Sequence, residues 1–556
     1  MSFRVVRRVV RRSVRHVRPR RNPYVRAPER PRGGPIRRPR HRPGVPPPVN
    51  KCEDVVTAGQ GPPYTQGRSR SGRTTAAARS PTTGYGVSMH GGRDVANDAS
   101  TVFDLVILGG GSGGYAAALR GAQLGLDVAL IEKNKLGGTC LHNGCIPTKA
   151  LLHAGEIADQ AREADKFGIK TSFEGVDIAG VHKYKDGVIA GLYKGLQGLV
   201  ASRKVTYIEG EGKLSSPTSV DVAGRRVEGR HVLLATGSVP KSLPGLEIDG
   251  NRIISSDHAL TLDRVPKSAI ILGGGVIGVE FASAWKSFGT DVTVIEGLKH
   301  LVPVEDENSS KLLERAFRKR GIKFNLGTFF DKAEYTADGV KVTLADGKTF
   351  EAEVLLVAIG RGPVSQGLGY EEQGVAMDRG YVLVDEYMRT NVPTISAVGD
   401  LVPTLQLAHV GFAEGMLVAE RLAGLKTVPV DYDGVPRVTY CHPEVASVGI
   451  TEAKAKEIYG ADKVVALKYN LAGNGKSNIL KTSGEIKLVQ VKDGAVVGVH
   501  MVGDRMGEQV GEAQLIYNWE ALPAEVAQLV HAHPTQNEAL GEAHLALAGK
   551  PLHSHD

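Results

Sequence analysis

Short apolar runs alternate with longer helix-forming stretches along the chain from residue 101 onwards. Phe103–Leu108 and Ser268–Leu272 have the length and composition of strands that are buried on both faces of a sheet. Each run is followed by a glycine-rich loop, at 109–114 and at 273–278, and then by a stretch typical of a helix. Strands that alternate with helices in this way predict an α/β protein built on parallel sheets.

Both glycine loops belong to a strand–loop–helix–strand unit that closes on a glutamate, Glu132 in the first unit and Glu296 in the second. The glutamate follows the first glycine of the loop by 23 residues in both units. A single glycine fingerprint is weak evidence, but two copies with equal spacing and equal context indicate two dinucleotide-binding units. The expected helices and closing strands are 115–124 with 127–131 in the first unit, and 280–288 with 291–295 in the second.

Each glycine of a loop is needed for a different physical reason. The first permits a tight turn, the second lets the backbone approach a pyrophosphate, and the third lets helix and strand pack closely. The phosphates would lie at the helix N-terminus, where free N–H groups and the helix dipole favour an anion. The glutamate would accept a hydrogen bond from a ribose hydroxyl, which favours NAD over NADP at the second unit; a glutamate that merely ends a surface strand is the alternative. The candidate residues are Gly109, Gly111, Gly114 and Glu132, followed by Gly273, Gly275, Gly278 and Glu296.

Three further apolar strands end in residues that are placed to meet a cofactor, because ligands of open α/β sheets bind beyond the carboxyl ends of strands. The third of them ends at Asp400, which could instead be a helix N-cap. The strands and the residues after them are 232–235 before Thr236 and Gly237, 354–359 before Gly360, and 394–398 before Gly399 and Asp400.

Composition changes this picture in two ways. No apolar run approaches the ~18 residues that a membrane helix needs, so we expect no membrane span. The chain has four cysteines, which are too few for a disulfide-stapled secreted scaffold. Two of them, Cys140 and Cys145, lie five positions apart. A close pair in a thiol-poor chain points to redox or metal chemistry.

Charge separates the first hundred residues from the rest. Residues 1–100 hold 22 Lys and Arg against 5 Asp and Glu, whereas residues 101–556 hold 47 against 55. The basic segment is rich in Arg, Pro and Gly and is expected to be disordered. It could be a basic tail, an organelle transit peptide, or upstream sequence before a true start near Met89 or Val95. The mildly acidic remainder gives no support for nucleic-acid binding by the folded core.

The cysteine pair cannot be bridged on one regular helix. Five helical residues rise about 7.5 Å, which exceeds the ~7 Å limit between the Cα atoms of a disulfide. Any bridge must therefore straddle a bend, and Gly144 supplies flexibility there while Pro147 suits the first turn of a following helix. Cys145 would lie at that helix N-terminus, where a thiolate is stabilised, with Lys149 one turn further on the same face.

Two other interpretations of the pair remain open, namely structural buried thiols or half of a zinc site. Four intervening residues and the lack of a second pair disfavour zinc, and we expect no metal. Residues 431–556 mix strand and helix patterns and end in a stretch with His531, His533 and Glu538. That stretch could supply a base with its orienting carboxylate, or a metal site whose further ligands are missing.

Together these motifs resemble the disulfide-dependent flavoprotein oxidoreductases, and among them the dihydrolipoyl dehydrogenases. The resemblance covers about residues 101–550 and rests on the features just described together with Ala408 and His409. It implies two Rossmann-like domains, for FAD and NAD, and a C-terminal α+β dimerisation domain. The implied divisions are a basic extension (1–100), an FAD domain (101–248), an NAD domain (249–368), a central domain (369–430) and an interface domain (431–556).

The resemblance also implies a role for each candidate residue in a homodimer. Cys140 and Cys145 would form a redox-active disulfide, with Cys140 exchanging with substrate and Cys145 facing FAD. His533 of the other subunit would be the acid/base, held by Glu538. Lys149 would pair with Glu280 near the flavin and the nicotinamide. The implied cofactor residues are Gly109, Gly111, Gly114, Glu132, Lys149, Thr236, Gly237, Asp400, Ala408 and His409 for FAD, and Gly273, Gly275, Gly278 and Glu296 for NAD, with Gly360 at a cofactor-facing strand end.

The implied reaction is the reoxidation of dihydrolipoyl groups on acyltransferase carrier domains of 2-oxo acid dehydrogenase complexes, with NAD as acceptor. The expected compartment is the cytoplasm, or the mitochondrial matrix if residues 1–94 are a transit segment. Several residues depart from the commonest family pattern, which leaves open another disulfide substrate, such as a glutathione- or mycothiol-type disulfide. A regulatory flavoprotein that binds nucleic acid through residues 1–94 is the alternative from another class. The departures are His142, Asn143, Thr148, Val364 and Asn537.

Overall fold

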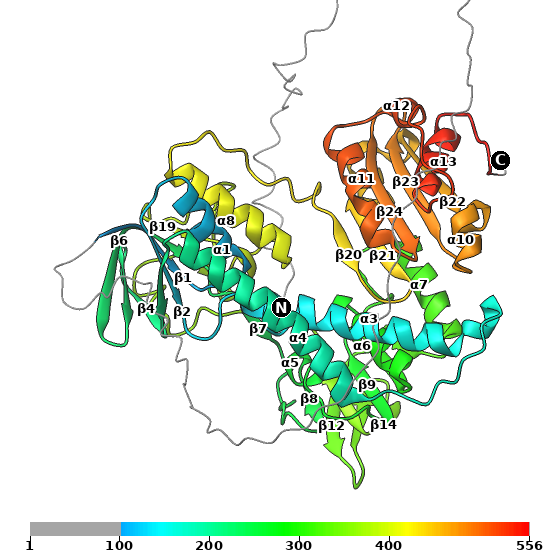
Figure 1. Cartoon of the computed structure of the whole chain (residues 1–556), viewed down its shortest axis with the longest axis horizontal. Helices are drawn as coiled ribbons and strands as arrows, with labels where there is room; N and C mark the ends of the chain where they lie inside the picture. Colours follow the sequence, from blue (N-terminus) through cyan, green and yellow to red (C-terminus); the bar gives the residue numbers. More distant parts are fainter. Residues whose placement is uncertain (1–101, 555–556) are drawn as a thin grey trace, which may run out of the picture. The chain divides into compact units, whose positions relative to one another are not determined.

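The structure is a computed structural model that describes residues 102–554 (Figure 1). The expectations for residues 1–100 therefore lie outside the described residues. The described part is an α/β protein with two largely parallel sheets, a five-stranded antiparallel sheet and smaller antiparallel sheets. Within residues 102–554, none of the helices combines the length and apolar character needed to cross a bilayer.

The first sheet is organised around its central strand, β1, which is parallel to both of its neighbours. Its inner strands β1, β2 and β19 and the second half of β6 are almost completely buried, as expected for a parallel sheet covered on both faces. A strand from much later in the chain, β19, joins this sheet beside β6. The strands are β1 (Phe103–Leu108), β2 (Val128–Glu132), β3 (Thr206–Glu209), β4 (Gly212–Ser216), β5 (Ser219–Val222), β6 (Arg225–Leu234) and β19 (Ile395–Ala397).

Helices α1 (Ser112–Gln123) and α8 (Ala408–Leu422) lie side by side against this sheet (Figure 1). Their close approach requires glycine, because a Cβ on Gly415 would come 2.2 Å from the carbonyl oxygen of Gly113. Arg120 and Glu420 add an ion pair of 2.7 Å between the two helices. The contact fixes the start of α8 beside the first glycine loop.

The second sheet repeats the plan of the first in the order β11-β10-β9-β15-β8, with every pairing parallel. An antiparallel three-stranded sheet, β12-β13-β14, follows in the chain. The elements are β8 (Ile253–Ile254), α5 (Ser256–Ala259), β9 (Ser268–Leu272), α6 (Val276–Phe288), β10 (Asp291–Glu296), α7 (Glu307–Lys319), β11 (Lys323–Leu326), β12 (Phe330–Tyr335), β13 (Val340–Leu344), β14 (Thr349–Ala352) and β15 (Val354–Val357).

The third sheet is antiparallel, in the order β20-β21-β24-β23-β22, and packs against α11 and α13. Its apolar side chains form one core with those of the two helices, among them Met501, Val510 and Leu540. The elements are β20 (Arg437–Thr439), β21 (Glu444–Gly449), α9 (Glu452–Tyr459), β22 (Val464–Asn470), α10 (Gly475–Ile479), β23 (Glu485–Val491), β24 (Val496–Gly503), α11 (Met506–Asn518), α12 (Pro523–Val526) and α13 (Glu538–Leu547).

Three helices connect the cysteine turn to both parallel sheets: α2 (Gly138–His142), α3 (Cys145–Arg162) and α4 (Ile178–Ser202). Helix α3 packs on α6, where a Cβ on Gly155 would come 2.9 Å from the Cβ of Ser287. Short elements complete the chain: η1 (Ala164–Phe167), β7 (Ser238–Pro240), β16 (Arg361–Pro363), β17 (Met377–Asp378), β18 (Tyr381–Val382), η2 (Gly399–Leu401), η3 (Ala461–Lys463) and η4 (Leu471–Gly473).

The two fingerprint helices begin earlier than the sequence pattern predicted. Helix α1 begins at Ser112 and α6 at Val276, with Gly111 and Gly275 as the residues before the first turn. The expected starts, at 115 and 280, were therefore wrong. The reason is that the second half of each glycine loop is itself the first helical turn, which a glycine run conceals.

Candidate redox-active site

The two cysteines flank a bend between two helices. Cys140 lies in the short helix α2, and Cys145 is the first residue of α3. Gly137, before α2, has φ +102°, a left-handed conformation that favours glycine. Gly144, with φ −150° and ψ −107°, separates the two helices, and Pro147 lies in the first turn of α3. Both residues are free thiols in this structure.

The two thiols have opposite protonation preferences. A hydrogen bond from Cys140, helped by the positive charge of Lys149, lowers the pKa of Cys145 to about 7. The same hydrogen bond, followed by burial, raises the pKa of Cys140. Because the pKa of Cys145 is about 7, Cys145 is a thiolate in about half of the molecules at pH 7, while Cys140 stays a thiol. Sequence reasoning had assigned the stabilisation of Cys145 to the helix N-terminus, whereas the structure adds the neighbouring thiol as the larger cause.

Lys149 forms an ion pair with Glu280, a residue of α6 that is 131 positions away in the sequence. The Nζ atom lies 3.0 and 2.8 Å from the two carboxylate oxygens. Burial opposes the charge of Lys149, but Glu280 outweighs it, and the pKa of Lys149 is raised. The pair thus keeps a cation close to Cys145.

Tyr440 is a member of this site that sequence reasoning missed. Its backbone N–H donates to Glu280 Oε1 over 2.9 Å, and the Lys149 Nζ atom lies 4.8 Å from the centre of its ring. A cation over an aromatic face is attracted by the ring quadrupole. Tyr440 contacts both members of the ion pair, but nothing in its local sequence signals a contact that spans 160 positions.

The first glycine loop has the shape that a bound dinucleotide requires. Gly109 has φ +110°, and a Cβ there would come 2.3 Å from the carbonyl oxygen of Ala235. A Cβ on Gly114 would come 1.8 Å from the carbonyl oxygen of Gly109, so helix and strand approach to backbone distance. At Gly111, by contrast, the nearest atom to an added Cβ is 3.9 Å away, which leaves room for a pyrophosphate.

The second loop has nearly the same backbone geometry as the first. Gly273 has φ +111°, and a Cβ on Gly278 would come 1.9 Å from the carbonyl oxygen of Gly273. A Cβ on Gly275 would meet no atom within 4 Å. Both loops therefore fit a dinucleotide phosphate at the N-terminus of the following helix.

The closing glutamates also occupy equivalent positions. Glu132 accepts from the N–H groups of Gly110 (2.7 Å) and Asn134 (2.8 Å). Glu296 accepts from the N–H groups of Gly274 (2.6 Å) and Leu298 (2.8 Å). A carboxylate oxygen accepts more than one hydrogen bond, so each glutamate is held against its loop and can still accept from a ribose hydroxyl.

Asp400 lies inside η2 and is not a helix N-cap, since the residue before that helix is Val398. Its Oδ2 accepts from Ser238 Oγ over 2.5 Å. Ser238 in turn accepts from Arg361 Nε over 2.8 Å, and Arg361 also donates to Thr139 Oγ1, beside Cys140, over 3.3 Å. This chain of polar groups connects a candidate FAD residue to the cysteine turn.

The other predicted cofactor residues lie near strand ends and at a helix start. Thr236 follows β6 and donates to the carbonyl oxygen of Val364 over 2.6 Å, and it lines a pocket together with Gly109 and Glu132. Ala408 and His409 are the first residues of α8, and the His409 ring is bonded to the carbonyl of Pro436 over 2.9 Å. Gly237 and Gly360 have φ +72° and +110° and follow β6 and β15.

The candidate base, His533, is paired with Glu538. The His533 Nδ1 atom lies 2.8 Å from Glu538 Oε1, and the N–H of Thr535 donates to Glu538 Oε2 over 2.7 Å. Burial opposes the charge of Glu538, but the hydrogen bonds from Thr535 and His533 lower its pKa. An ionised Glu538 makes Nδ1 the donor and leaves Nε2 to exchange a proton. The His533 side chain is 77% exposed in the single chain.

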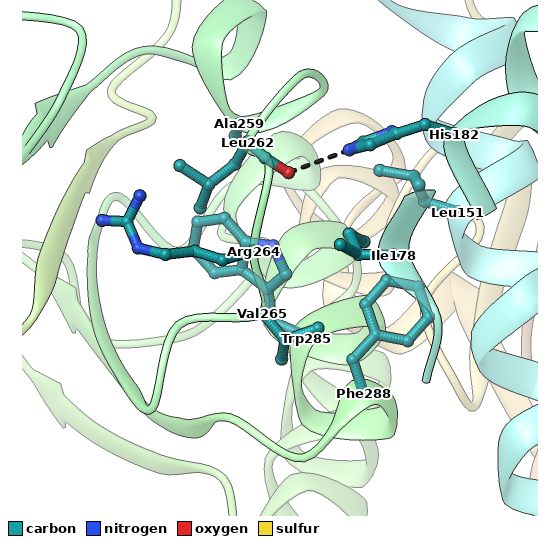
Figure 2. Close-up of a pocket in the computed structure, with 9 residues that line it drawn as sticks. All are labelled: Leu151, Ile178, His182, Ala259, Leu262, Arg264, Val265, Trp285 and Phe288. Carbon is teal, nitrogen blue, oxygen red and sulfur yellow. Dashed lines mark hydrogen bonds between the residues drawn. The ribbon is translucent and has the colours of Figure 1, made fainter. Parts of the chain in front are cut away.

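A separate apolar pocket lies between α3, α4 and α6 (Figure 2). Leu151, Trp285 and Phe288 line it, and the His182 ring is bonded to the carbonyl of Leu262 over 2.8 Å. It contains none of the residues that the sequence predicted for catalysis or cofactor binding, and it is not part of the candidate site.

Comparison with known proteins agrees with this geometry. Residues 103–415 match the pyridine nucleotide-disulphide oxidoreductase family, and residues 435–544 match the dimerisation domain of the same family. Among solved structures, LpdA from Mycobacterium tuberculosis has a TM-score of 0.75 at 28% identity, covering 80% of this chain and 99% of its own. The HOCl-induced flavoprotein disulfide reductase RclA from Escherichia coli has a TM-score of 0.72 at 26% identity, covering 79% and 99%.

Two curated relatives are more similar in sequence. A dihydrolipoyl dehydrogenase from Bacillus subtilis is 41% identical over 474 residues, which are 82% of this chain and all of the relative. A leghemoglobin reductase from Glycine max is 41% identical over 466 residues, which are 81% of this chain and 88% of the relative. The cofactors of the chain are FAD and NAD, for which the two loops provide fitting sites. The chain belongs to the pyridine nucleotide-disulphide oxidoreductase family.

Proposed function

We propose that the protein is a dihydrolipoyl dehydrogenase, which oxidises dihydrolipoyl groups and reduces NAD. The observation that carries this proposal is the asymmetric cysteine pair, with Cys145 at a pKa of about 7 beside the Lys149–Glu280 ion pair. Several curated relatives of about 40% identity that bear this name, each spanning more than 80% of this chain, support it. The substrate would be lipoyl groups on acyltransferase carrier domains of 2-oxo acid dehydrogenase complexes.

The first chemical step is thiol–disulfide exchange at Cys140. A substrate thiol loses its proton to His533 Nε2, and the resulting thiolate attacks the Cys140 sulfur of the Cys140–Cys145 disulfide. Cys145 leaves as a thiolate. A thiol of lower pKa is the better leaving group, so the low pKa of Cys145 directs attack to Cys140.

The second step closes the substrate ring. The other substrate thiol attacks the mixed disulfide at the substrate sulfur, and its proton passes to the departing Cys140 sulfur, which releases oxidised lipoyl and leaves Cys140 as a thiol. The pair has then gained two electrons. A bound FAD, held by the first glycine loop, would supply the two-electron chemistry that connects this pair to NAD at the second loop. Throughout, Lys149 steadies the negative charge of Cys145, and Glu280 holds Lys149 in place.

The site is proposed to be completed by a second copy of the chain. His533 is the candidate base, yet its side chain is 77% exposed in one chain, and the residues around it match a dimerisation domain. In a homodimer, variants Cys145→Ser and His533→Gln, each inactive alone, should complement one another. Random mixing of subunits would restore about a quarter of wild-type activity, because half of the dimers carry one intact site. No recovery after mixing would place the base in the same subunit as the thiols.

We also propose the division into an FAD domain (101–248), an NAD domain (249–368), a central domain (369–430) and an interface domain (431–556). Helix α8 and strand β19, which belong to the central segment, pack with elements of the first sheet and support its role in the FAD site. For the compartment we propose the cytoplasm, with the mitochondrial matrix as the alternative that the plant relatives named "mitochondrial" would favour.

Steady-state oxidation of dihydrolipoamide, measured with NAD and with NADP, tests the function. The proposal expects turnover with NAD and a strong preference over NADP, since Glu296 would repel a 2′-phosphate. Parallel assays should offer glutathione- and mycothiol-type disulfides with NADH. Faster reduction of one of these disulfides than oxidation of dihydrolipoamide would replace the proposal with the second candidate, a low-molecular-weight disulfide reductase.

A further inference from the structure

A second histidine–carboxylate pair lies two residues before the candidate base. The His531 Nε2 atom is 2.9 Å from Glu512 Oε1, and Glu512 belongs to α11. The His531 side chain is 12% exposed, in contrast to 77% for His533. The chemical steps proposed above use His533 and leave this partly buried pair without a role.

The same carboxylate also holds the other end of the loop. The second oxygen of Glu512 accepts from the side-chain amide of Asn537, the residue that precedes Glu538. One carboxylate on α11 therefore binds the chain on both sides of His533, at 531 and at 537. Asn537 is one of the residues that depart from the usual family pattern, in which serine is common at this position. In this chain the contact with Glu512 is therefore made by an amide group.

The His531 ring occupies a slot that is shaped for it. On its other side lies α13, where a Cβ on Gly541 would come 2.4 Å from His531 Nδ1 and 2.6 Å from Cε1. No other residue could occupy position 541 without displacing the ring. Gly541 has an ordinary helical backbone conformation, which any residue could adopt. Glycine is needed at this position because of the close approach of the His531 ring.

The charges around the slot favour a charged His531. The hydrogen bond with Glu512 raises the pKa of His531 against the effect of burial, with Glu538 adding in the same direction. His544 of α13 also lies near Glu512 and His531, and burial lowers its pKa. Among the described residues, the acidic groups that face His531 are thus Glu512 and Glu538.

We propose that Glu512 is a positioning residue for the acid/base: by binding His531 and Asn537 together, it fixes the loop that presents the His533–Glu538 pair. The inference rests on the proposed function, because it assigns His533 to the dithiol half of that reaction. It predicts that the network matters for dithiol oxidation and not for hydride transfer between NADH and flavin, in which His533 takes no part.

The Glu512→Gln substitution tests the claim on the holoenzyme. An amide has one acceptor oxygen and a donor in place of the other, so His531 and Asn537 in their present orientations cannot both keep their acceptor, and the negative charge opposite His531 is lost. We expect kcat for dihydrolipoamide oxidation to fall by about tenfold, since a displacement of about 1 Å in a catalytic group can cost up to 10²-fold. The rate of NADH oxidation by ferricyanide, which bypasses the thiols, should stay within about twofold of wild type.

A reversed pair provides the rescue. In the double variant Glu512→Gln with Asn537→Asp, the new amide donates to the new carboxylate while its oxygen still accepts from His531. Both hydrogen bonds return, and kcat should recover to within about threefold of wild type. The matched control is Glu520→Gln, the same change at an exposed residue just after α11, which should leave both activities unchanged.

Gly541→Ala is an independent variant that leaves every polar group in place. It should displace the His531 ring and reproduce the selective loss of dithiol oxidation. The inference fails if Glu512→Gln keeps wild-type kcat, if the double variant does not recover, or if both activities fall together in the single variants. A wild-type enzyme that does not oxidise dihydrolipoamide at all would instead refute the proposed function.

Discussion

The protonation asymmetry of the cysteine pair can be tested by removing its largest cause. The Cys140→Ala substitution deletes the thiol that donates to Cys145, whereas Cys140→Ser keeps a hydroxyl donor at the same position. Both variants abolish the disulfide and leave Cys145 reduced. Their difference therefore isolates the hydrogen bond from Cys140.

The magnitude follows from the pKa of Cys145. Its pKa of about 7 lies below the ordinary value of 9.0, a difference of roughly 2 units, or about 3 kcal/mol at ~1.4 kcal/mol per unit. The hydrogen bond from Cys140 is the largest contribution and Lys149 supplies the next favourable one. Loss of the hydrogen bond from Cys140 should raise the pKa of Cys145 by about one unit. The thiolate fraction of Cys145 at pH 7 would then fall from about one half to about one tenth.

The assay is the rate of iodoacetamide alkylation of Cys145 as a function of pH, followed by mass spectrometry. Because the pKa of Cys145 is lowered, its reactivity is present above pH 7 and is lost as the pH falls through that value. In Cys140→Ala the midpoint should move up by about one unit, and the rate at pH 7 should fall about fivefold. In Cys140→Ser the midpoint should move less. Equal midpoints in the two variants would refute the assignment of the shift to this hydrogen bond.

Three further predictions concern the ion pair, the second loop and the base. Tyr440→Leu removes the ring over Lys149 but keeps the backbone donor to Glu280. The pKa of Cys145, measured in the same alkylation assay, should therefore rise by a few tenths of a unit. An unchanged midpoint would show that the ring does not contribute to the pKa of Cys145. Gly278→Ala should raise the Kd for NADH at least tenfold while FAD stays bound, since a Cβ would lie 1.9 Å from a carbonyl oxygen; unaltered NADH titrations would contradict this reason for the glycine. His533→Gln should slow dithiol oxidation by 10²-fold or more while NADH oxidation by ferricyanide persists, and parallel loss of both would argue against an acid/base role.

The two dinucleotide units could be predicted from the sequence because their glycines have local steric reasons. Gly114 and Gly278 each approach the backbone of the first glycine of their own loop, and the spacing to Glu132 follows from one strand, one turn and one helix. The bend at the cysteines was predictable for a similar reason, since the reach of a helix excludes the alternative. The helix starts were wrong because glycine obscures where the first turn begins.

The sequence pattern did not predict the long helix α4, because no local steric requirement specifies it. It contains five glycines within 25 residues, and each costs roughly 1 kcal/mol of helix propensity relative to alanine. Its structure depends on packing that no local pattern reveals, such as the buried Lys185, whose Nζ donates to the carbonyl of Leu260 over 2.7 Å. Tertiary contacts override propensity in such segments.

The supporting residues of the site were also beyond sequence reasoning. Tyr440 acts through Glu280, which is 160 positions away in the sequence. Glu512 acts through His531 and Asn537, which are 19 and 25 positions away. Neither Tyr440 nor Glu512 lies in a motif of its own. The candidates that were found, Cys140, Cys145 and His533, lie in local motifs. The sequence therefore identified the reacting groups and some groups that hold them, such as Glu538 and Lys149, whereas Tyr440 and Glu512 required the fold.

The central claim, that electrons from the dithiol pass through Cys140 and Cys145, is tested most directly by a single turnover. Oxidised enzyme is mixed anaerobically with one equivalent of dihydrolipoamide in the absence of NAD, quenched, alkylated and analysed by mass spectrometry. The account predicts two newly alkylated thiols, at Cys140 and Cys145, while the buried Cys441 is labelled to the same extent before and after reduction. Formation of oxidised lipoamide without any gain of label at Cys140 and Cys145 would contradict it.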